Sequence, residues 1–110
     1  MDILTRIEEI YLLAIWKLQD NAYGVTIKKK VTEMTGKIVS YGALYFTLDQ
    51  LNKKGYVIKN QGDPTPVRGG CAKIFYILTP VGKKALKTAH ELQSNIWDGV
   101  SSVIFDESHN

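Results

Sequence analysis

The sequence predicts a mainly α-helical fold with one small β-hairpin, and three observations support this fold class. Apolar residues recur at the spacing of amphipathic helices in four stretches, over residues 5–18, 21–35, 40–55 and 80–99. β-Branched and aromatic residues gather in two short runs that favour strands, Tyr56–Asn60 and Ile74–Leu78. The length of 110 residues fits one folded unit with a modest core, to which dimerisation would add useful buried area.

The composition excludes several classes of protein. Apolar residues at 45% and charged residues at 23% are ordinary globular values, which disfavours disordered and fibrous chains. No apolar run approaches the roughly 18 residues that span a bilayer, and the acidic start is unlike a signal peptide, so we expect a cytoplasmic protein that does not bind membranes. The single cysteine, Cys71, excludes an internal disulfide and a cysteine-rich metal site.

The net charge of +3 conceals a segregation of charge along the chain. Residues 21–90 carry twelve basic and three acidic side chains, a charge of +9, whereas residues 1–20 carry −2 and residues 91–110 carry −4. A basic centre between acidic ends is typical of a chain whose middle binds a polyanion. The alternative is a solvated surface with lysines scattered evenly around it.

The first predicted helix, over residues 5–18, is apolar around nearly its whole circumference. A helix of this kind is buried on more than one side. In so small a chain, we expect the second side to pack against another subunit. The residues of this helix that we place in a dimer interface are Ile7, Tyr11, Leu12 and Ile15.

The next two predicted helices are joined by a short turn that contains Gly36. Asn21 can cap the first of them, which runs to about Thr35. Ser40 is expected to cap the second helix, because its side-chain oxygen accepts from free N–H groups, and Gly55 to end it in the left-handed conformation. This pattern predicts a helix-turn-helix.

The helix over Ser40–Gly55 has two different faces. Leu44, Leu48 and Leu51 form one apolar stripe, which we expect in the core. The opposite face carries aromatic and small residues that a solvated helix face would not normally carry, namely Gly42, Tyr45, Phe46, Asp49 and Lys53. We interpret this stretch as a DNA recognition helix.

The long segment QGDPTPVRGGCAK separates the two predicted strands, so the hairpin forms a wing and completes a winged helix-turn-helix over residues 1–78. Thr79 and Pro80 then begin a long helix. Its apolar seam needs a partner, which predicts a dimerisation helix over residues 79–105, followed by a frayed tail at residues 106–110. The seam residues placed in the dimer interface are Ala85, Ala89, Leu92, Ile96 and Val100.

Four segments carry a family resemblance: AYGVTI at 22–27, SYGALYFTLDQLNKKGYV at 40–57, RGG at 68–70 and KIFYILTPVGKKAL at 73–86. In order and spacing, over roughly residues 5–90, they resemble the PadR family of transcriptional regulators, in its small subfamily with one C-terminal helix. The resemblance implies a winged helix-turn-helix homodimer that binds double-stranded operator DNA, represses transcription and often releases DNA when a small molecule binds.

The candidate DNA-binding residues lie on the recognition helix and in its basic surroundings. The N-terminal half of the helix offers donors, acceptors and flat surfaces to base edges, and Tyr45 matches the tyrosine of the family's recognition helix. Lysines can bind phosphate, and an arginine in the wing can enter a minor groove or fork onto phosphate. The candidates are Ser40, Tyr41, Gly42, Tyr45, Lys28, Lys53, Lys54, Arg68 and Lys73, with a core role as the alternative for both tyrosines.

Three departures from the family pattern leave other functions open. Phe46 stands where the family often has proline or threonine, and Gln50 stands where a basic residue is common. Cys71-Ala72 stands at the base of the wing, which is often rich in arginine in the family. Two of these departures remove positive charge. The alternatives are a winged-helix protein-interaction module without specific DNA binding, and a small-molecule binder at the dimer interface.

Trp16 and Trp97 are candidate effector-binding residues, because the resemblance implies that flat aromatic compounds bind near the dimer interface. The alternative for both tryptophans is simple packing. Cys71 is a redox sensor or a spectator thiol, and it has no second cysteine to resolve it. His90 and His109 lack partners at ligand spacing, and no catalytic arrangement is present, so we expect no metal, no cofactor and no enzymatic activity.

Overall fold

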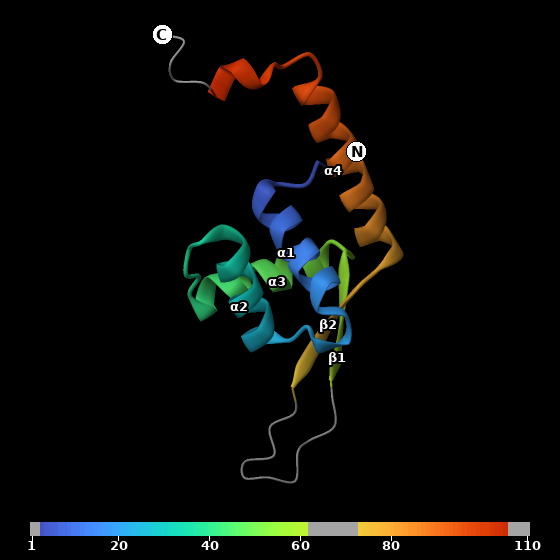
Figure 1. Cartoon of the computed structure of the whole chain (residues 1–110). Helices are drawn as coiled ribbons and strands as arrows, with labels where there is room; N and C mark the ends of the chain where they lie inside the picture. Colours follow the sequence, from blue (N-terminus) through green and yellow to red (C-terminus); the bar gives the residue numbers. More distant parts are fainter. Residues whose placement is uncertain (1–2, 62–72, 106–110) are drawn as a thin grey trace.

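The computed structural model describes residues 3–61 and 73–105, apart from the Val103 side chain (Figure 1). The elements follow in the order α1 (Arg6–Leu18), a 3₁₀ turn η1 (Gln19–Asn21), α2 (Gly24–Thr35), α3 (Tyr41–Lys53), β1 (Val57–Gln61), β2 (Ile74–Leu78), α4 (Pro80–Trp97) and a 3₁₀ turn η2 (Ser102–Phe105). The predicted fold class is confirmed. The predictions for Arg68, Cys71, Ala72 and the tail at 106–110 lie outside the described residues.

Helix α1 is the centre of the fold. It contacts α2, α3, β2 and α4, and Figure 1 shows α2 and α3 on one side of it and α4 on the other. Its inward residues meet the apolar faces of the surrounding elements. The fully buried core includes Tyr11, Leu12, Ala14 and Ile15 of α1, Ile27 of α2, Leu44, Leu48 and Leu51 of α3, and Val57 of β1.

This core corrects the expected dimer interface on α1. Tyr11, Leu12 and Ile15 are already buried within the single chain, so their placement against another subunit is wrong. The second side of α1 is covered by the hairpin and α4, which come from later in the same chain. Ile7 remains exposed on α1.

Local hydrogen bonds mark the helix starts, but one helix does not begin at the predicted residue. The Ser40 hydroxyl accepts from the backbone N–H of Ala43 at 3.1 Å, as expected of an N-cap. Asn21, however, does not cap α2, which begins three residues later. The reason is tertiary, because the backbone after Asn21 is extended and bonds to the hairpin: the N–H of Tyr76 donates to the Ala22 carbonyl at 2.8 Å.

The antiparallel hairpin is joined tightly to the start of α4. Val57 pairs with Leu78, and the register places Lys59 opposite Tyr76. The Thr79 hydroxyl accepts from the N–H of Gly82 at 3.0 Å and donates to the Gly55 carbonyl at 2.6 Å. Thr79 therefore caps α4, as predicted, and also ties the helix to the end of the recognition segment.

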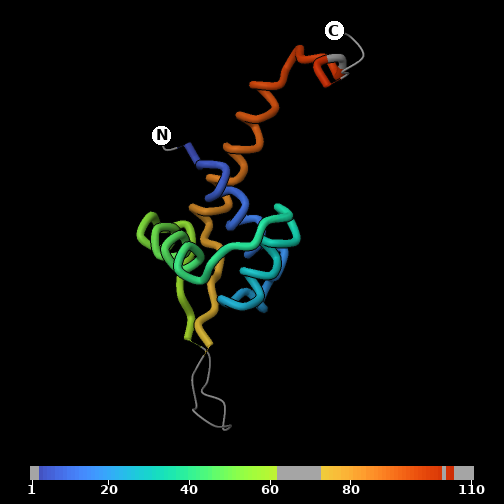
Figure 2. The backbone as a smooth tube through the Cα atoms, turned by 90° about the vertical axis from the view of Figure 1, so that its left-hand side faces the viewer, coloured from blue at the N-terminus to red at the C-terminus, as the bar shows by residue number. Residues whose placement is uncertain are grey.

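Helix α4 leaves the body as a projecting rod (Figure 2). It ends at Trp97, and the chain turns at Gly99, which has a φ of +80°. The prediction that Val100 continues the α4 seam is therefore wrong, because the backbone changes direction before it. Within residues 3–61 and 73–105, none of the helices is both long and apolar enough to cross a membrane.

Candidate nucleic-acid interface

The faces of α3 divide as the sequence predicts. Leu44, Leu48 and Leu51 are fully buried, and they hold the helix against the core. The opposite face is exposed along its length, with Gly42, Tyr45, Phe46, Asp49 and Lys53 at the surface. A helix anchored by one stripe in this way presents the other face as a rigid surface to a partner.

Two tyrosines and one lysine that were predicted to bind DNA form a cluster at the N-terminal half of α3. The Tyr41 and Tyr45 rings stack with centroids 6.2 Å apart and an interplanar angle of 19°. The Lys28 ammonium lies 5.1 Å from the centroid of the Tyr41 ring, within range of a cation–π contact. We call these three residues the tyrosine cluster. It places a positive charge from α2 beside the start of α3.

Tyr45 combines the two roles that the sequence left open. A Cβ atom on Gly24 would lie 2.1 Å from the Tyr45 hydroxyl oxygen, so this ring packs against the glycine that begins α2. The side chain nevertheless stays 44% exposed. Tyr45 is thus held in place at its tip by α2, while the rest of its ring faces solvent.

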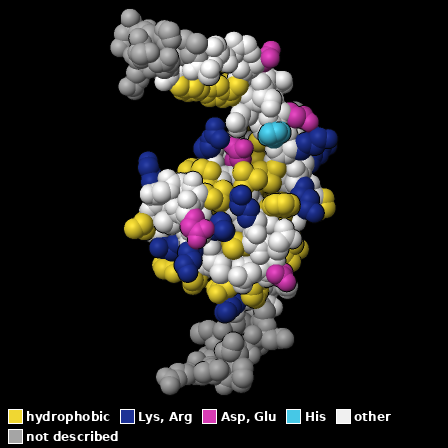
Figure 3. Space-filling view, viewed as in Figure 1, with side chains coloured by type: hydrophobic (Ala, Val, Ile, Leu, Met, Phe, Trp, Pro, Cys, Tyr) yellow, Lys and Arg dark blue, Asp and Glu magenta, His cyan; other side chains and the backbone are white. Residues whose placement is uncertain are grey.

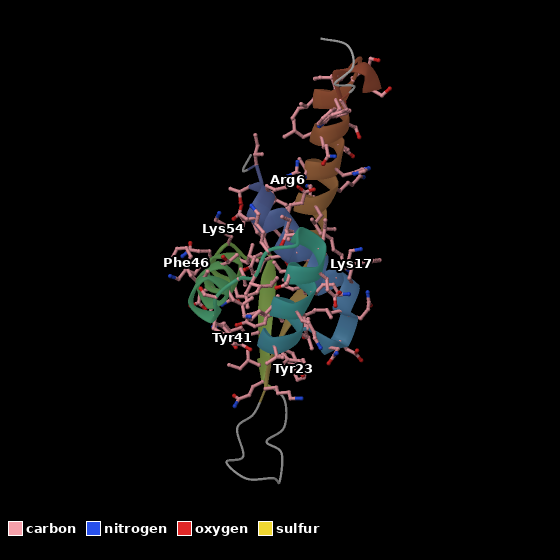
Figure 4. The ribbon with its side chains drawn as sticks, turned by 60° about the vertical axis from the view of Figure 1, so that its left-hand side comes forward. Arg6, Lys17, Tyr23, Tyr41, Phe46 and Lys54 are labelled. Carbon is pink, nitrogen blue, oxygen red and sulfur yellow. The ribbon has the colours of Figure 1, made fainter. Side chains whose placement is uncertain are left out.

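A second aromatic cluster lies at the end of the hairpin strands where Gln61 pairs with Ile74. The Lys73 ammonium lies 4.5 Å from the centroid of the Tyr23 ring, which meets Phe75 edge-on with centroids 5.5 Å apart. Figure 4 shows Tyr23 and Tyr41 near the end of the domain from which the hairpin strands project. Lys73 therefore lies near the start of α2, and Arg68 lies outside the described residues.

Ion pairs change the charge of the recognition helix. Asp49 pairs with Lys59 of β1 at 3.2 Å, which neutralises the acidic side chain in the middle of α3. Lys54 pairs with Glu8 of α1 at 2.5 Å, which gives it a structural role, and its binding of phosphate stays a prediction. Lys53 is exposed at the end of α3. Neither pair could be predicted from sequence spacing, because the partners are on different elements.

Tyr76 lies on the hairpin face that meets α3. Burial raises the pKa of its hydroxyl, and the nearby Asp49 and Tyr45 raise it further. The hydroxyl is therefore neutral at ordinary pH. It contributes a buried aromatic support beneath the exposed part of α3 and carries no charge toward a ligand.

The two tryptophans line different hollows. Trp16 lines a groove of about 470 Å³ together with Phe75, Ile77 and Lys83. Trp97 stacks on Phe105 with centroids 5.7 Å apart, and it borders a hollow of about 340 Å³ between the start of α1 and α4. The single chain therefore does not bring the two predicted effector residues together.

Several apolar side chains of the protruding α4 stay exposed in the part of the chain that the structure describes. Ala89 and Leu92 line the hollow beside Trp97, and Ile96 at its edge is 65% exposed. Figure 3 shows hydrophobic side chains gathered over α1 and toward α4 on this face.

In the described part of the chain, no group of three or more His, Cys, Asp or Glu residues could hold a metal ion.

Comparisons with known proteins agree with this architecture. The family model for the transcriptional regulator PadR-like family matches residues 12–88, more than half of the chain. A comparison with curated protein sequences finds no match.

Several solved structures share the fold. A PadR-like transcription factor from Bacteroides fragilis matches with a TM-score of 0.71 at 22% identity, covering 86% of this chain and 85% of the other. A PadR family transcription regulator from Clostridium difficile matches with a TM-score of 0.65 at 20% identity, covering 93% of this chain and 97% of the other. A transcriptional regulator from Clostridium thermocellum gives a TM-score of 0.65 at 25% identity, covering 86% and 93%.

The family match covers the helix-turn-helix, the hairpin and the start of α4. Members of this family are DNA-binding transcription regulators, which confirms the prediction that the chain is not an enzyme. The resemblance drawn from the sequence segments is confirmed by the same match. The chain belongs to the PadR-like family of transcriptional regulators.

Proposed function

We propose that this regulator is a sequence-specific repressor that binds operator DNA as a homodimer. The observation that carries the proposal is the rigid, exposed outer face of α3, held opposite a fully buried leucine stripe. In a helix-turn-helix, the corresponding face of the second helix enters the major groove. The tyrosine cluster lies at the N-terminal half of α3, the part of such a helix that contacts base edges.

Phosphate binding comes from the lysines around α3. Lys28 approaches the groove from α2, Lys53 lies at the other end of α3, and Lys73 directly precedes β2, at the end of the strands where Gln61 pairs with Ile74. The helix start at Ser40 and Gly42 brings backbone N–H groups near phosphate. Arg68 in the wing adds a contact to the minor groove or the backbone.

The dimer forms through α4 and the exposed part of α1. Ile96 is exposed at the edge of the hollow that the α4 seam borders, whereas exposed Ile7 lines a separate hollow with Val31 and Ile38. A second copy packed along the α4 seam would bury Ile96, with Ala85, Ala89 and Leu92 at its centre. Two-fold symmetry then requires operator half-sites about 34–36 Å apart, or a multiple of that distance.

A planar aromatic effector would bind where the dimer brings tryptophans together. Trp97 is exposed on the projecting helix and is already stacked on one ring, which leaves the rest of the indole open to a ligand or to the second subunit. Titration of the purified dimer with planar aromatic compounds tests this role through tryptophan fluorescence. If a compound quenches the fluorescence of the parent protein and of Trp16→Leu but not that of Trp97→Leu, the result supports Trp97 as the effector-binding residue. If no compound changes the fluorescence, the result contradicts that role.

The DNA-binding proposal is tested by selecting bound fragments from random duplexes. Enrichment of a two-fold symmetric site is expected, with an affinity that falls steeply as salt rises. Lys28→Ala should lower the magnitude of the salt slope by about 1 for each half-site contact, since one phosphate contact is lost. Lys87→Ala, the same charge change on exposed α4, is the matched control and should leave the slope unchanged.

A protein-interaction module is the second candidate function. It is favoured by the exposed aromatic side chain of Phe46 and by the pairing of Asp49 with Lys59, which leave the middle of α3 without free positive charge. Absence of duplex binding at low salt, together with a stable stoichiometric protein complex, would replace the repressor proposal with this one.

A further inference from the structure

Phe46 occupies the outermost line of the recognition helix. It lies two residues after Leu44 and two before Leu48, and each step of two residues rotates about 200° around a helix. Its side chain therefore points away from the buried leucine stripe, and it is 67% exposed. Figure 4 shows Phe46 projecting from the outer side of α3.

The surroundings of Phe46 leave that side of the helix open. Gly42, one turn earlier, has no side chain, and a Cβ atom placed there would meet nothing closer than the Ser40 hydroxyl at 4.0 Å. The tyrosine cluster lies on the flank toward α2, where Tyr45 packs against Gly24. A surface approaching α3 head-on would therefore meet the Phe46 ring between the start of the helix and Lys53.

The chemistry of the ring selects what it can contact in a major groove. Phenylalanine has no donor or acceptor, so it cannot bind phosphate or replace a hydrogen bond to a base edge. The thymine C5-methyl group is the apolar group that distinguishes bases in the major groove, and aromatic and other apolar side chains pack against it. An exposed phenylalanine at this position is suited to that methyl group.

The neighbouring charges favour the same contact. Asp49 would repel phosphate if it were unpaired, but Lys59 of the hairpin neutralises it at 3.2 Å. The middle of α3 thus approaches DNA without a strong charge of either sign, while lysines supply attraction at the edges. Under these conditions, an apolar contact is not opposed by the burial of an unpaired ion.

We infer that Phe46 is a specificity-determining residue that packs on a thymine methyl group in each operator half-site. This inference rests on the proposed DNA-binding function and adds the base that the middle of α3 selects. It predicts a preference for thymine over uracil, which differs from thymine only by that methyl group. Covering the exposed ring also removes apolar surface from water, which favours binding.

The experiment uses the duplex selected from random sequence and replaces its thymines by uracil, one symmetric pair at a time. When the pair that Phe46 contacts is replaced by uracil, binding of the parent protein should weaken about fourfold for each methyl group lost, the change expected from burying one such group. Loss of the methyl groups in both half-sites should therefore weaken binding about fifteenfold. Phe46→Ala should bind the thymine and uracil duplexes equally. Phe46→Leu should keep part of the preference, because its side chain is also apolar.

The outcomes separate this inference from the proposed function. Duplex binding with the same uracil response in the parent protein and in Phe46→Ala overturns the inference alone. Failure of the parent protein to bind any duplex overturns both proposals. Because Phe46 is exposed, its variants should melt at the temperature of the parent protein. Equal melting temperatures would show that a variant has lost its preference for thymine without losing its fold.

Discussion

Glu8 joins the start of α1 to the end of the recognition helix. Its carboxylate accepts from the backbone N–H of Thr5 at 2.9 Å and from the Lys54 ammonium at 2.5 Å. Burial alone would raise the pKa of this carboxyl, but the bonds from Lys54 and Thr5, with the lysine charge, lower it below its ordinary value. Glu8 thus takes part in capping α1 and also forms a long-range ion pair with Lys54.

The lowered pKa of Glu8 makes its contribution to stability dependent on pH. Because the pKa is lower in the folded state than in the unfolded state, the stabilisation is present above the unfolded value and is lost as pH falls through the folded value. Glu8→Gln should therefore lower the free energy of unfolding by about 1–2 kcal/mol at pH 7, a value reduced for the 45% exposed Lys54 side chain.

Urea unfolding at pH 7 and at pH 3 measures this effect. The difference between the parent protein and Glu8→Gln should shrink at the lower pH, because the stabilisation by Glu8 is lost as its carboxyl becomes protonated. Glu9→Gln is the matched control, since Glu9 makes a looser pair with exposed Arg6 at 3.5 Å. An equal difference at both pH values would contradict the assignment.

At the scale of elements, close backbone packing fixes α4 against the hairpin. Gly82 in the first turn of α4 lies so near β1 that an added Cβ atom would be 2.3 Å from the Tyr56 carbonyl oxygen. Thr79 caps the same turn and bonds to the Gly55 carbonyl. The direction in which α4 leaves the body is therefore determined at its first turn.

The same substitution in two helices should have opposite effects on stability. Gly82→Ala is expected to destabilise the protein by about 1–3 kcal/mol, because the new methyl group collides with backbone that cannot move aside. Gly42→Ala on exposed α3 should stabilise it by about 0.5–1 kcal/mol, because alanine favours a helix and meets only open space.

Thermal unfolding of the two glycine variants beside the parent protein gives the comparison. A lower midpoint for Gly82→Ala and a higher one for Gly42→Ala are expected. If Gly82→Ala also raised the midpoint, helix propensity rather than the contact with Tyr56 would control stability at Gly82.

At the scale of the whole molecule, the chain is elongated, with extents of 61 × 32 × 21 Å. The recognition helix and the hairpin belong to the compact body, whereas α4 projects from it (Figures 1 and 2). The basic segment 21–90 includes α2, α3 and the strands, and it continues into the first part of α4, which carries Lys83, Lys84 and Lys87. The surfaces proposed for DNA binding and for self-association thus lie on different parts of one molecule.

The proposed dimer is tested by a charge placed on the α4 seam. Ile96→Asp should leave the fold of the single chain intact, since Ile96 is already exposed, but it should convert the dimer to monomer and weaken operator binding at least tenfold. Ser94→Asp, two residues earlier on the opposite side of α4, is the matched control and should remain dimeric.

Analytical ultracentrifugation over a range of concentrations distinguishes these states. The parent protein and Ser94→Asp should sediment as dimers, and Ile96→Asp should sediment as a monomer at the same concentrations. A monomeric parent protein, or an unaffected Ile96→Asp dimer, would remove α4 from the proposed interface.

The sequence by itself determined the elements whose signals are local. The Ser40 and Thr79 caps, the leucine stripe of α3 and the two strands follow from side-chain hydrogen bonding and apolar periodicity, which operate within a few residues. The exposed outer face of α3 follows from the same periodicity, because burial of one stripe leaves the opposite residues outside.

Only the tertiary structure decided which apolar side chains of α1 face the core and which lysines of the basic segment form long-range ion pairs. Tyr11, Leu12 and Ile15 are covered by elements from later in the chain, and α2 starts late because Ala22 bonds to the hairpin. Lys54 is taken up by Glu8, 46 residues away. The physical reason is that such contacts depend on how distant segments pack, and nearest-neighbour patterns carry no record of that packing.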